Sequence, residues 1–195
     1  MKTFKALEST KTDQGNTLSI IEKSIDDLPE GEILIKVNYS SLNYKDALSA
    51  SGAPGVTRNY PHTPGIDAAG IVEQTTDSKF KEGDSVIVTG YDLGMNTAGG
   101  FGEYIRVPSS WVINLPKGLT EKDSMILGTA GLTAGLSIQA LDDFNSNDGF
   151  DGSSSVVSGS TGGVGSVAVM LLSKLGSSVT AVTGKNTQKE LLETI

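Results

Sequence analysis

Residues 154–165 read Ser-Ser-Val-Val-Ser-Gly-Ser-Thr-Gly-Gly-Val-Gly, a short candidate strand followed by a glycine-rich turn. Apolar residues then recur at helical spacing over residues 164–175, and Gly176 is a natural stop for that helix. Residues 178–182 are rich in β-branched side chains, which favours a second strand. The order strand, helix, strand predicts a β-α-β unit whose two strands are parallel neighbours.

The glycine-rich turn has the features of a phosphate-binding loop. Glycines let the backbone approach a pyrophosphate, and the N–H groups and dipole at the start of the helix favour its negative charge. The spacing is G-x-x-G-G-x-G rather than G-x-G-x-x-G, and the chain has 24 glycines, so a purely structural turn is the alternative. The flanking strands and helix favour a dinucleotide site.

The end of the second strand indicates the type of dinucleotide. NAD sites commonly place a carboxylate there, on the ribose 2′-hydroxyl. The chain instead reads Thr183-Gly184-Lys185, and Lys185 could meet a 2′-phosphate as a point charge. This pattern favours NADPH, and a solvated surface lysine is the alternative.

The first 117 residues differ from this region, because short runs of alternating apolar residues are separated by Gly, Pro and Asn. The runs are residues 18–25, 32–42, 68–74, 84–89, 103–107 and 111–115. Their spacing predicts a β-barrel or folded sheet. From Thr120 onward the pattern predicts a capped helix with apolar positions over residues 125–141, and then a loop over residues 142–155.

Composition narrows the functional classes. The 15 Lys and Arg against 23 Asp and Glu give a net charge of −8, which argues against nucleic acid or an anionic membrane surface as a partner. The absence of Cys and the single His exclude thiolate zinc sites, disulfides and a Cys nucleophile. No apolar N-terminal segment is present, and the longest apolar run, residues 167–172, is too short to span a bilayer. We expect a cytoplasmic protein.

Four motifs resemble the medium-chain dehydrogenase/reductase superfamily. They are Ser-Leu-Asn-Tyr-Lys-Asp at 41–46, Pro-Gly-Ile-Asp at 64–67, Gly-Thr-Ala-Gly-Leu-Thr-Ala at 128–134 and Gly-Gly-Val-Gly at 162–165. The first two are similar to the zinc-free quinone-oxidoreductase-like branch that includes NADPH-dependent acryloyl-CoA reductase. The match extends over all 195 residues in the same order.

The resemblance implies a mixed α/β architecture. Residues 1–119 would form a GroES-like catalytic β-barrel domain, residues 120–150 a linking helix and loop, and residues 151–195 the first β-α-β unit of a Rossmann NADPH-binding domain. A Rossmann domain needs about six strands, so we expect a truncated chain in which residues 187–195 begin a helix. We also expect uncovered apolar surface on the two strands and on the helix carrying Leu171 and Leu172.

The resemblance also implies a reaction. Zinc-dependent relatives have a Cys where this chain has Asn43, and a His near Ile66 and Asp67, so we expect no metal. What remains is NADPH-dependent hydride addition to the C=C bond of an α,β-unsaturated acyl-CoA, acryloyl-CoA to propanoyl-CoA, with hydrogen-bond donors stabilising the developing enolate. Asp67 could equally hydrogen-bond backbone groups or act in catalysis.

By the same resemblance, Tyr44 lies near the nicotinamide and Thr133 lines the nicotinamide pocket. Tyr44 is the catalytic candidate, and either proton donation or packing and positioning would explain it. The other predicted cofactor contacts form two groups: Thr161, Gly162, Gly163 and Val164 at the pyrophosphate, and Thr183, Gly184 and Lys185 at the 2′-phosphate. Lys185 replaces the family's usual arginine.

Two other readings stay open. The acceptor could be a quinone, because NADPH chemistry is common to both kinds of enzyme in this branch. Alternatively, the chain could be an inactive fragment that acts only as a binding module. The expected partners are an acyl-CoA or quinone-like small molecule and a second subunit in a homodimer of the full-length protein, with no nucleic acid and no membrane.

Overall fold

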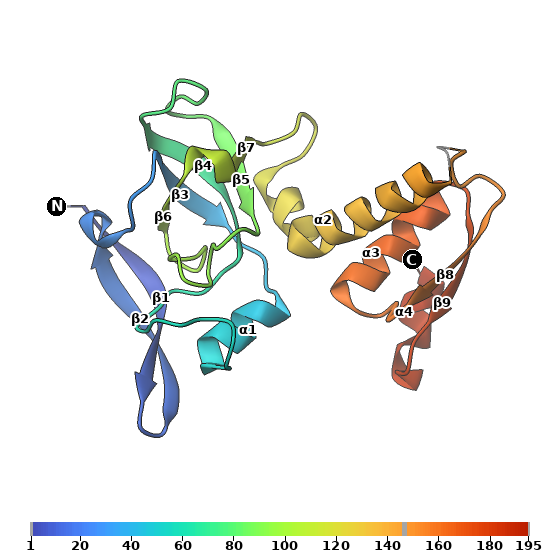
Figure 1. The fold of residues 1–195 in the computed structure, drawn as a ribbon, viewed down its shortest axis with the longest axis horizontal. Helices are drawn as coiled ribbons and strands as arrows, with labels where there is room; N and C mark the ends of the chain where they lie inside the picture. Colours follow the sequence, from blue (N-terminus) through green and yellow to red (C-terminus); the bar gives the residue numbers. More distant parts are fainter. Residues whose placement is uncertain (1, 146–147, 195) are drawn as a thin grey trace. The chain divides into compact units, whose positions relative to one another are not determined.

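A computed structural model describes residues 2–145 and 148–194 of the chain. Residues 146–147 of the predicted loop, and Ile195 at the end of the predicted C-terminal helix, lie outside the described residues. The backbone forms two compact units, Met1–Thr129 and Ala130–Ile195 (Figure 1). The domain limits given by the resemblance, 1–119, 120–150 and 151–195, stay predictions.

The first unit consists mainly of antiparallel strands. They are β1 (Thr3–Thr12), β2 (Gly15–Ser24), β3 (Ile33–Tyr39), β4 (Asp67–Thr75), β5 (Ser85–Thr89), β6 (Tyr104–Val107) and β7 (Val112–Asn114). Strands β1 and β2 form a hairpin, and the other five form a sheet in the order β6-β3-β4-β5-β7. The unit also contains helix α1 (Tyr44–Ser51) and the short 3-10 helices η1 (Ile25–Asp27) and η2 (Ser109–Trp111). Each of the six predicted runs contains most of one strand.

The main core of this unit lies on one face of the five-stranded sheet. Alternate residues of β3, Ile33 and Ile35, are fully buried against Val72 of β4 and Val86 and Val88 of β5. Burial of one such side chain contributes about 1.5–3 kcal/mol, so this face supplies much of the stability of the unit. Period-two alternation in the sequence is what selects these residues for the core.

The opposite face of β3 is covered by β1, which the sequence pattern did not predict. Leu34 is buried there together with Phe4 and Ala6 of β1 and Tyr104 of β6. Beyond residue 6 most of β1 and β2 is exposed and polar, so the hairpin carries too little apolar alternation to be recognised from sequence.

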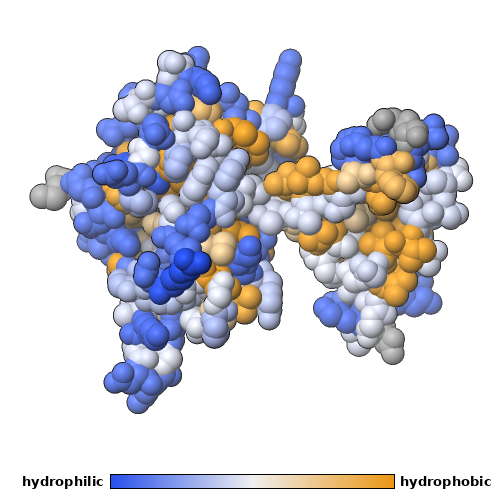
Figure 2. All heavy atoms as spheres, viewed as in Figure 1, coloured by the Kyte–Doolittle hydropathy of each residue, from blue (hydrophilic) through white to orange (hydrophobic). Residues whose placement is uncertain are grey.

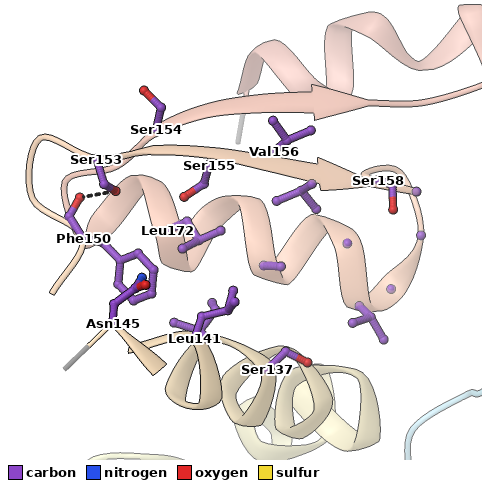
Figure 3. A pocket seen from close by; sticks show the side chains of 18 residues that line it. Ser137, Leu141, Asn145, Phe150, Ser153, Ser154, Ser155, Val156, Ser158 and Leu172 are labelled. Atoms are coloured by element: carbon purple, nitrogen blue, oxygen red, sulfur yellow. Dashed lines mark hydrogen bonds between the residues drawn. The ribbon is translucent and has the colours of Figure 1, made fainter. Parts of the chain in front are cut away.

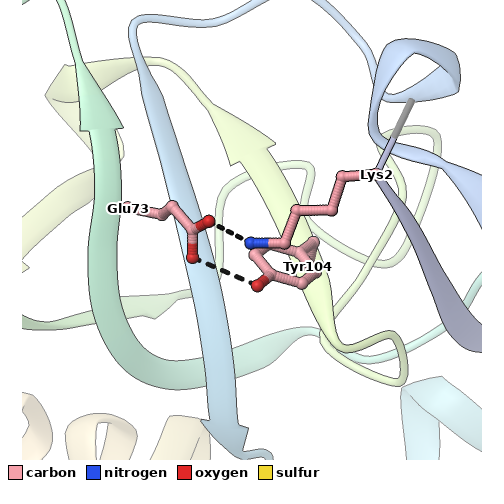
Figure 4. A network of polar contacts seen from close by, with 3 residues as sticks. All are labelled: Lys2, Glu73 and Tyr104. Carbon is pink, nitrogen blue, oxygen red and sulfur yellow. Dashed lines mark hydrogen bonds and ion pairs between the residues drawn. The ribbon is translucent and has the colours of Figure 1, made fainter.

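A polar network fixes the start of β1 to the sheet (Figure 4). The Lys2 ammonium contacts the Glu73 carboxylate and lies 4.6 Å from the centre of the Tyr104 ring. The Tyr104 hydroxyl donates to Glu73 Oε2 at 3.1 Å. The hydrogen bond from Lys2 lowers the pKa of Glu73, which keeps this carboxylate charged and paired.

Helix α2 (Glu121–Phe144) begins with the predicted cap and is broken near its start. Thr120 Oγ1 accepts the Asp123 N–H at 3.1 Å, and Asp123 Oδ2 accepts the Thr120 N–H at 3.2 Å, which is a capping box. Gly128 interrupts the helix with φ 50° and ψ −155°. Only glycine adopts this conformation without strain, and a Cβ at this position would overlap Ser41 Oγ and lie 2.8 Å from Asp67 Oδ2.

The length of α2, and a mean hydropathy of 1.3 over an 18-residue window of it, would permit a membrane span. The break at Gly128, however, leaves a continuous helix over residues 129–144. At 1.5 Å per residue this segment is about 24 Å long, less than the roughly 30 Å of a bilayer core.

The second unit contains the predicted β-α-β unit. Strands β8 (Ser154–Ser158) and β9 (Ser178–Val182) are parallel, and α3 (Gly163–Lys174) connects them. Gly176 follows α3 with φ 90°, as expected for a helix stop. The 3-10 helix η3 (Asn186–Gln188) and α4 (Lys189–Thr194) follow β9. The expected β-α-β order is confirmed.

Much apolar surface of the second unit is uncovered. Figure 2 shows apolar side chains at the surface of α2 and of the second unit. On one face of the strand pair Val156 is 73% exposed and Val182 is 47% exposed. The expectation that Leu172 would be uncovered is wrong. Leu172 is only 4% exposed, because Ile138 of α2 and Phe150 pack against it.

Substitution of Gly128 by Ala will destabilise the first unit. The positive φ disfavours any L-residue, and the new methyl group would overlap Ser41 and Asp67. We expect a loss of at least about 2 kcal/mol in the free energy of unfolding, measured in urea. Gly135→Ala is the matched control: its Cβ would meet open space within the same helix, so it should be neutral or slightly stabilising. Equal effects of both substitutions would contradict this account.

The buried His62 will make stability depend on pH. This side chain is 5% exposed, and its backbone pairs with Ser9 of β1 through N···O distances of 2.8 and 2.9 Å. Burial lowers its pKa in the folded state, so the unfolded state binds a proton more readily. Stability is therefore full above the ordinary pKa of about 6.5 and falls below it.

We expect unfolding experiments to show a loss of up to about 1.4 kcal/mol between pH 7.5 and 5.5 from this group. His62 is the single histidine, so His62→Gln should remove this part of the pH dependence. A pH dependence that is the same in His62→Gln would contradict the assignment.

Candidate functional site

The loop between β8 and α3 holds the glycine residues predicted to approach a cofactor. Gly159 turns the chain with φ 64°, and its carbonyl accepts the Gly162 N–H at 2.9 Å. A Cβ on Gly165 would overlap the Gly159 carbonyl and lie 2.9 Å from Ser160 Cα, so this position admits only glycine. The loop is therefore folded tightly onto the first turn of α3.

The first turn of α3 is open to an anion. Gly162 is the N-cap residue, and no side chain caps this end of the helix. A helix N-terminus presents several N–H groups that have no partner within the helix, and its dipole favours negative charge. Gly162 and Gly163 have no side chains to block approach to these groups. The residues present therefore fit a pyrophosphate group.

A second set of contacts ties this loop to the turn after β9. The fully buried Ser160 donates its N–H to the Val182 carbonyl at 3.1 Å, and its Oγ accepts the Val182 N–H at 3.0 Å. One residue further along each segment, the hydroxyls of Thr161 and Thr183 lie 3.1 Å apart. We refer to these four residues as the loop clasp. The clasp brings together the two groups of cofactor residues that the sequence predicts.

The turn after β9 carries a positive charge and no carboxylate. Lys185 donates its backbone N–H to Thr183 Oγ1 at 3.1 Å, which fixes the turn, and its side chain is exposed. The only salt bridges found among the described residues involve other lysines. Lys185 is thus available to an anionic group beside the glycine loop.

A hollow of about 700 Å³ extends from the glycine loop along β8 (Figure 3). Its walls are Ser137 and Leu141 of α2, Val156 of β8, and Phe150 and Leu172. Among the described residues, β8 pairs with β9 alone, so one edge of this strand is free. The hollow is open and mostly apolar, and the loop residues form only one end of it, beside Ser158 in Figure 3.

The first unit contains a buried polar cluster at the position where the resemblance puts zinc ligands. Asp67, fully buried, accepts hydrogen bonds from Asn43 Nδ2 and from the Thr129 N–H, both at 2.9 Å, and from Thr129 Oγ1 at 2.7 Å. One of these partners is a backbone N–H, and hydrogen bonding to backbone groups was one of the two roles expected for Asp67. Among the described residues, no three His, Asp or Glu side chains gather as metal ligands.

A second buried carboxylate, Asp46, belongs to the same cluster and was missed by the sequence analysis. Asp46 accepts the Asn43 N–H at 2.8 Å and the Ile66 N–H at 2.9 Å. Burial raises the pKa of Asp46, although these two hydrogen bonds oppose the rise. The signal available in the sequence was the spacing of Asn43 and Asp46, three residues apart at the start of a helix.

The two remaining predicted site residues are on helices α1 and α2. Tyr44 is the first residue of α1 and is 81% exposed. Thr133 lies in the second half of α2, where its carbonyl accepts the Ser137 hydroxyl at 2.8 Å. The structure thus brings together Thr161–Val164 with Thr183–Lys185, and the roles of Tyr44 and Thr133 stay predictions.

Comparison with known proteins agrees with this geometry. The family model for the alcohol dehydrogenase GroES-like domain matches residues 29–117. The acrylyl-CoA reductase AcuI of Ruegeria pomeroyi is 42% identical over 184 residues, which cover 93% of this chain and 55% of the relative. YhfP of Bacillus subtilis, which carries a provisional assignment as a quinone oxidoreductase, is 42% identical over 190 residues, covering 97% and 57%. The chain belongs to the medium-chain dehydrogenase/reductase superfamily.

Solved structures place it in the quinone-oxidoreductase-like branch of this superfamily. The Escherichia coli protein YhdH with bound NADPH has a TM-score of 0.91 and 41% identity, covering 97% of this chain and 58% of that one. Bacillus subtilis yhfP with bound NAD has a TM-score of 0.93 and 41% identity, covering 100% and 58%. These matches confirm a GroES-like domain followed by the start of a Rossmann unit. The chain spans somewhat more than half the length of these superfamily members.

Proposed function

We propose that the protein is an NADPH-dependent oxidoreductase that reduces the C=C bond of an α,β-unsaturated acyl-CoA, acryloyl-CoA to propanoyl-CoA. The observation that carries this proposal is the turn of Thr183, Gly184 and Lys185, which lacks a carboxylate and is held beside the glycine loop by the loop clasp. One relative was solved with NADPH and another with NAD, so the residues of this chain must decide between them. A lysine at this turn favours the 2′-phosphate.

Different residues of the chain would bind different parts of NADPH. The N–H groups at the start of α3 would hold the pyrophosphate, and Lys185 would hold the 2′-phosphate. Tyr44 and Thr133 would border the nicotinamide, and the exposed ring of Tyr44 suits packing against a flat partner. NADPH supplies the hydride when it is bound.

Acyl-CoA as acceptor is supported by the 42% identity with the acrylyl-CoA reductase of Ruegeria pomeroyi. Hydride addition to an α,β-unsaturated thioester generates an enolate, which hydrogen-bond donors stabilise. Asn43 stands where zinc-dependent relatives have Cys, and its amide already donates to Asp67. We infer that the reaction proceeds without a metal and that the donors to the enolate are other groups.

A quinone acceptor is the second candidate. YhfP, with its provisional assignment as a quinone oxidoreductase, is as similar to this chain as the acrylyl-CoA reductase, at 42% identity. Both reactions use the same cofactor site, so the features of the second unit support them equally.

Reversal of the charge at Lys185 will test the cofactor preference. In Lys185→Glu the carboxylate would repel a 2′-phosphate, so we expect NADPH to bind at least about ten-fold more weakly and NADH to be much less affected. Fluorescence titration of the chain measures both dissociation constants. Lys174→Glu, exposed at the other end of α3, makes the same change in net charge and should leave both unchanged. Equal binding of NADH and NADPH by the parent chain would refute the preference.

Turnover will separate the two acceptors. We expect the protein in its native length to oxidise NADPH with acryloyl-CoA, and kcat/KM to be at least about ten-fold higher than with a simple quinone. Propanoyl-CoA, which lacks the C=C bond, is the control and should give no oxidation. Faster turnover with the quinone would favour the second candidate.

A further inference from the structure

The hydroxyl of Thr183 occupies a central place in the loop clasp. It accepts the backbone N–H of Lys185 at 3.1 Å and lies 3.1 Å from the hydroxyl of Thr161. A hydroxyl has one proton and two acceptor lone pairs. Lys185 occupies one lone pair of Thr183, and the Thr183 proton can donate to Thr161 Oγ1. The proton of Thr161 is then free to donate outward.

This direction of donation matches the needs of a phosphate ligand. A phosphate oxygen accepts hydrogen bonds and donates none, so a hydroxyl beside it must supply a proton. Donation from Thr183 to Thr161 would complete the order Lys185 N–H, Thr183 O–H, Thr161 O–H, in which each group donates to the next and polarisation strengthens each bond. Thr161 immediately precedes the N-cap residue Gly162, where the pyrophosphate is expected.

The pair of threonines is not required to join the two segments. Ser160, one residue earlier, already fixes the glycine loop to β9 through two bonds with Val182, and it also donates its Oγ–H to the Val157 carbonyl at 2.7 Å. Ser160 is fully buried, whereas Thr161 and Thr183 are only partly buried. The Ser160–Val182 bonds already hold the two segments together. The Thr161–Thr183 contact lies at the accessible end of the clasp and is therefore suited to ligand binding.

We propose that Thr183 is a positioning residue that couples the two phosphate contacts of the cofactor. Its hydroxyl orients the Thr161 O–H as a donor to the pyrophosphate and holds the Lys185 turn in place for the 2′-phosphate. The identity of the ligand rests on the proposed function. The coupling itself rests on the hydrogen bonds of the clasp.

A double-mutant cycle tests the coupling. Thr161→Val and Thr183→Val keep the shape of each side chain and remove its hydroxyl, and fluorescence titration gives the dissociation constant for NADPH. We expect each single variant to bind about ten-fold more weakly and the double variant to bind no more weakly than the singles. Thr183→Ser keeps the hydroxyl and should bind within about two-fold of the parent. Thr180→Val, at an exposed position of β9, is the matched control, and its affinity for NADPH should be unchanged.

A second readout needs no nucleotide. Hydrogen exchange of the Lys185 amide in the free chain should become faster in Thr183→Val and remain unchanged in Thr180→Val, because only Thr183 accepts this N–H. Unchanged exchange in Thr183→Val would overturn the role of Thr183 in holding the turn.

Two results in the cycle would overturn the coupling. One is a double variant weakened by the product of the single effects, about a hundred-fold. The other is a Thr183→Ser variant as weak as Thr183→Val. The cycle is run with NADH as well. Equal affinity of the parent for NADH and NADPH would refute the proposed NADPH preference. Non-additive effects of the two substitutions with either nucleotide would still support the coupling.

Discussion

The buried carboxylate of Asp67 connects three segments of the first unit. It is placed at the start of β4, in the centre of the five-stranded sheet, and it accepts hydrogen bonds from Asn43, just before α1, and from Thr129, just after the break in α2. A buried carboxylate is costly unless its oxygens are satisfied, so these partners must stay in place. The positions of α1 and of the break in α2 both depend on this constraint.

The break at Gly128 follows from the same constraint. The helix must release one residue from helical geometry so that the Thr129 N–H and hydroxyl can both reach Asp67. A side chain at residue 128 would occupy the space next to Asp67 Oδ2, so glycine is required for steric as well as conformational reasons. The carboxylate then serves as an acceptor at the start of the second helical segment, where negative charge is favoured.

The sequence predicted most of the elements that a local pattern determines. The β-α-β unit, the cap at Thr120 and the stop at Gly176 were all predicted, because alternation, helical spacing and capping are properties of neighbouring residues. Helix α1 was missed although Asn43 and Asp46 form a capping box at its start, which is a local signal. Strand β1 was not predicted because it gains its place from Phe4 and Ala6 packing on Leu34. Contacts between residues far apart in sequence leave no local pattern.

In the candidate site, too, local patterns could be predicted from the sequence and long-range contacts could not. The glycine loop and the turn at Lys185 could each be predicted from its own residues, but their connection by Ser160 and Thr183 could not, because 22 or more residues separate the partners. Leu172 was expected to be uncovered for a related reason: Phe150 and Ile138, which cover it, come from segments read as loop and linking helix. Predicting which surfaces are buried therefore required the tertiary structure.

The geometry of Asp67 also restricts the chemistry of the proposed reaction. Both of its oxygens accept hydrogen bonds, and no part of the residue is exposed, so it is closed to a substrate and unsuited to act as a proton carrier. Asn43 directs its amide into the same cluster and is occupied there. At the position where the resemblance puts zinc ligands, Asn43 and Asp67 hold segments of the first unit together. Donors that stabilise an enolate must then come from accessible groups, and Tyr44, adjacent to Asn43 and 81% exposed, is the one predicted catalytic residue in the first unit that meets this requirement.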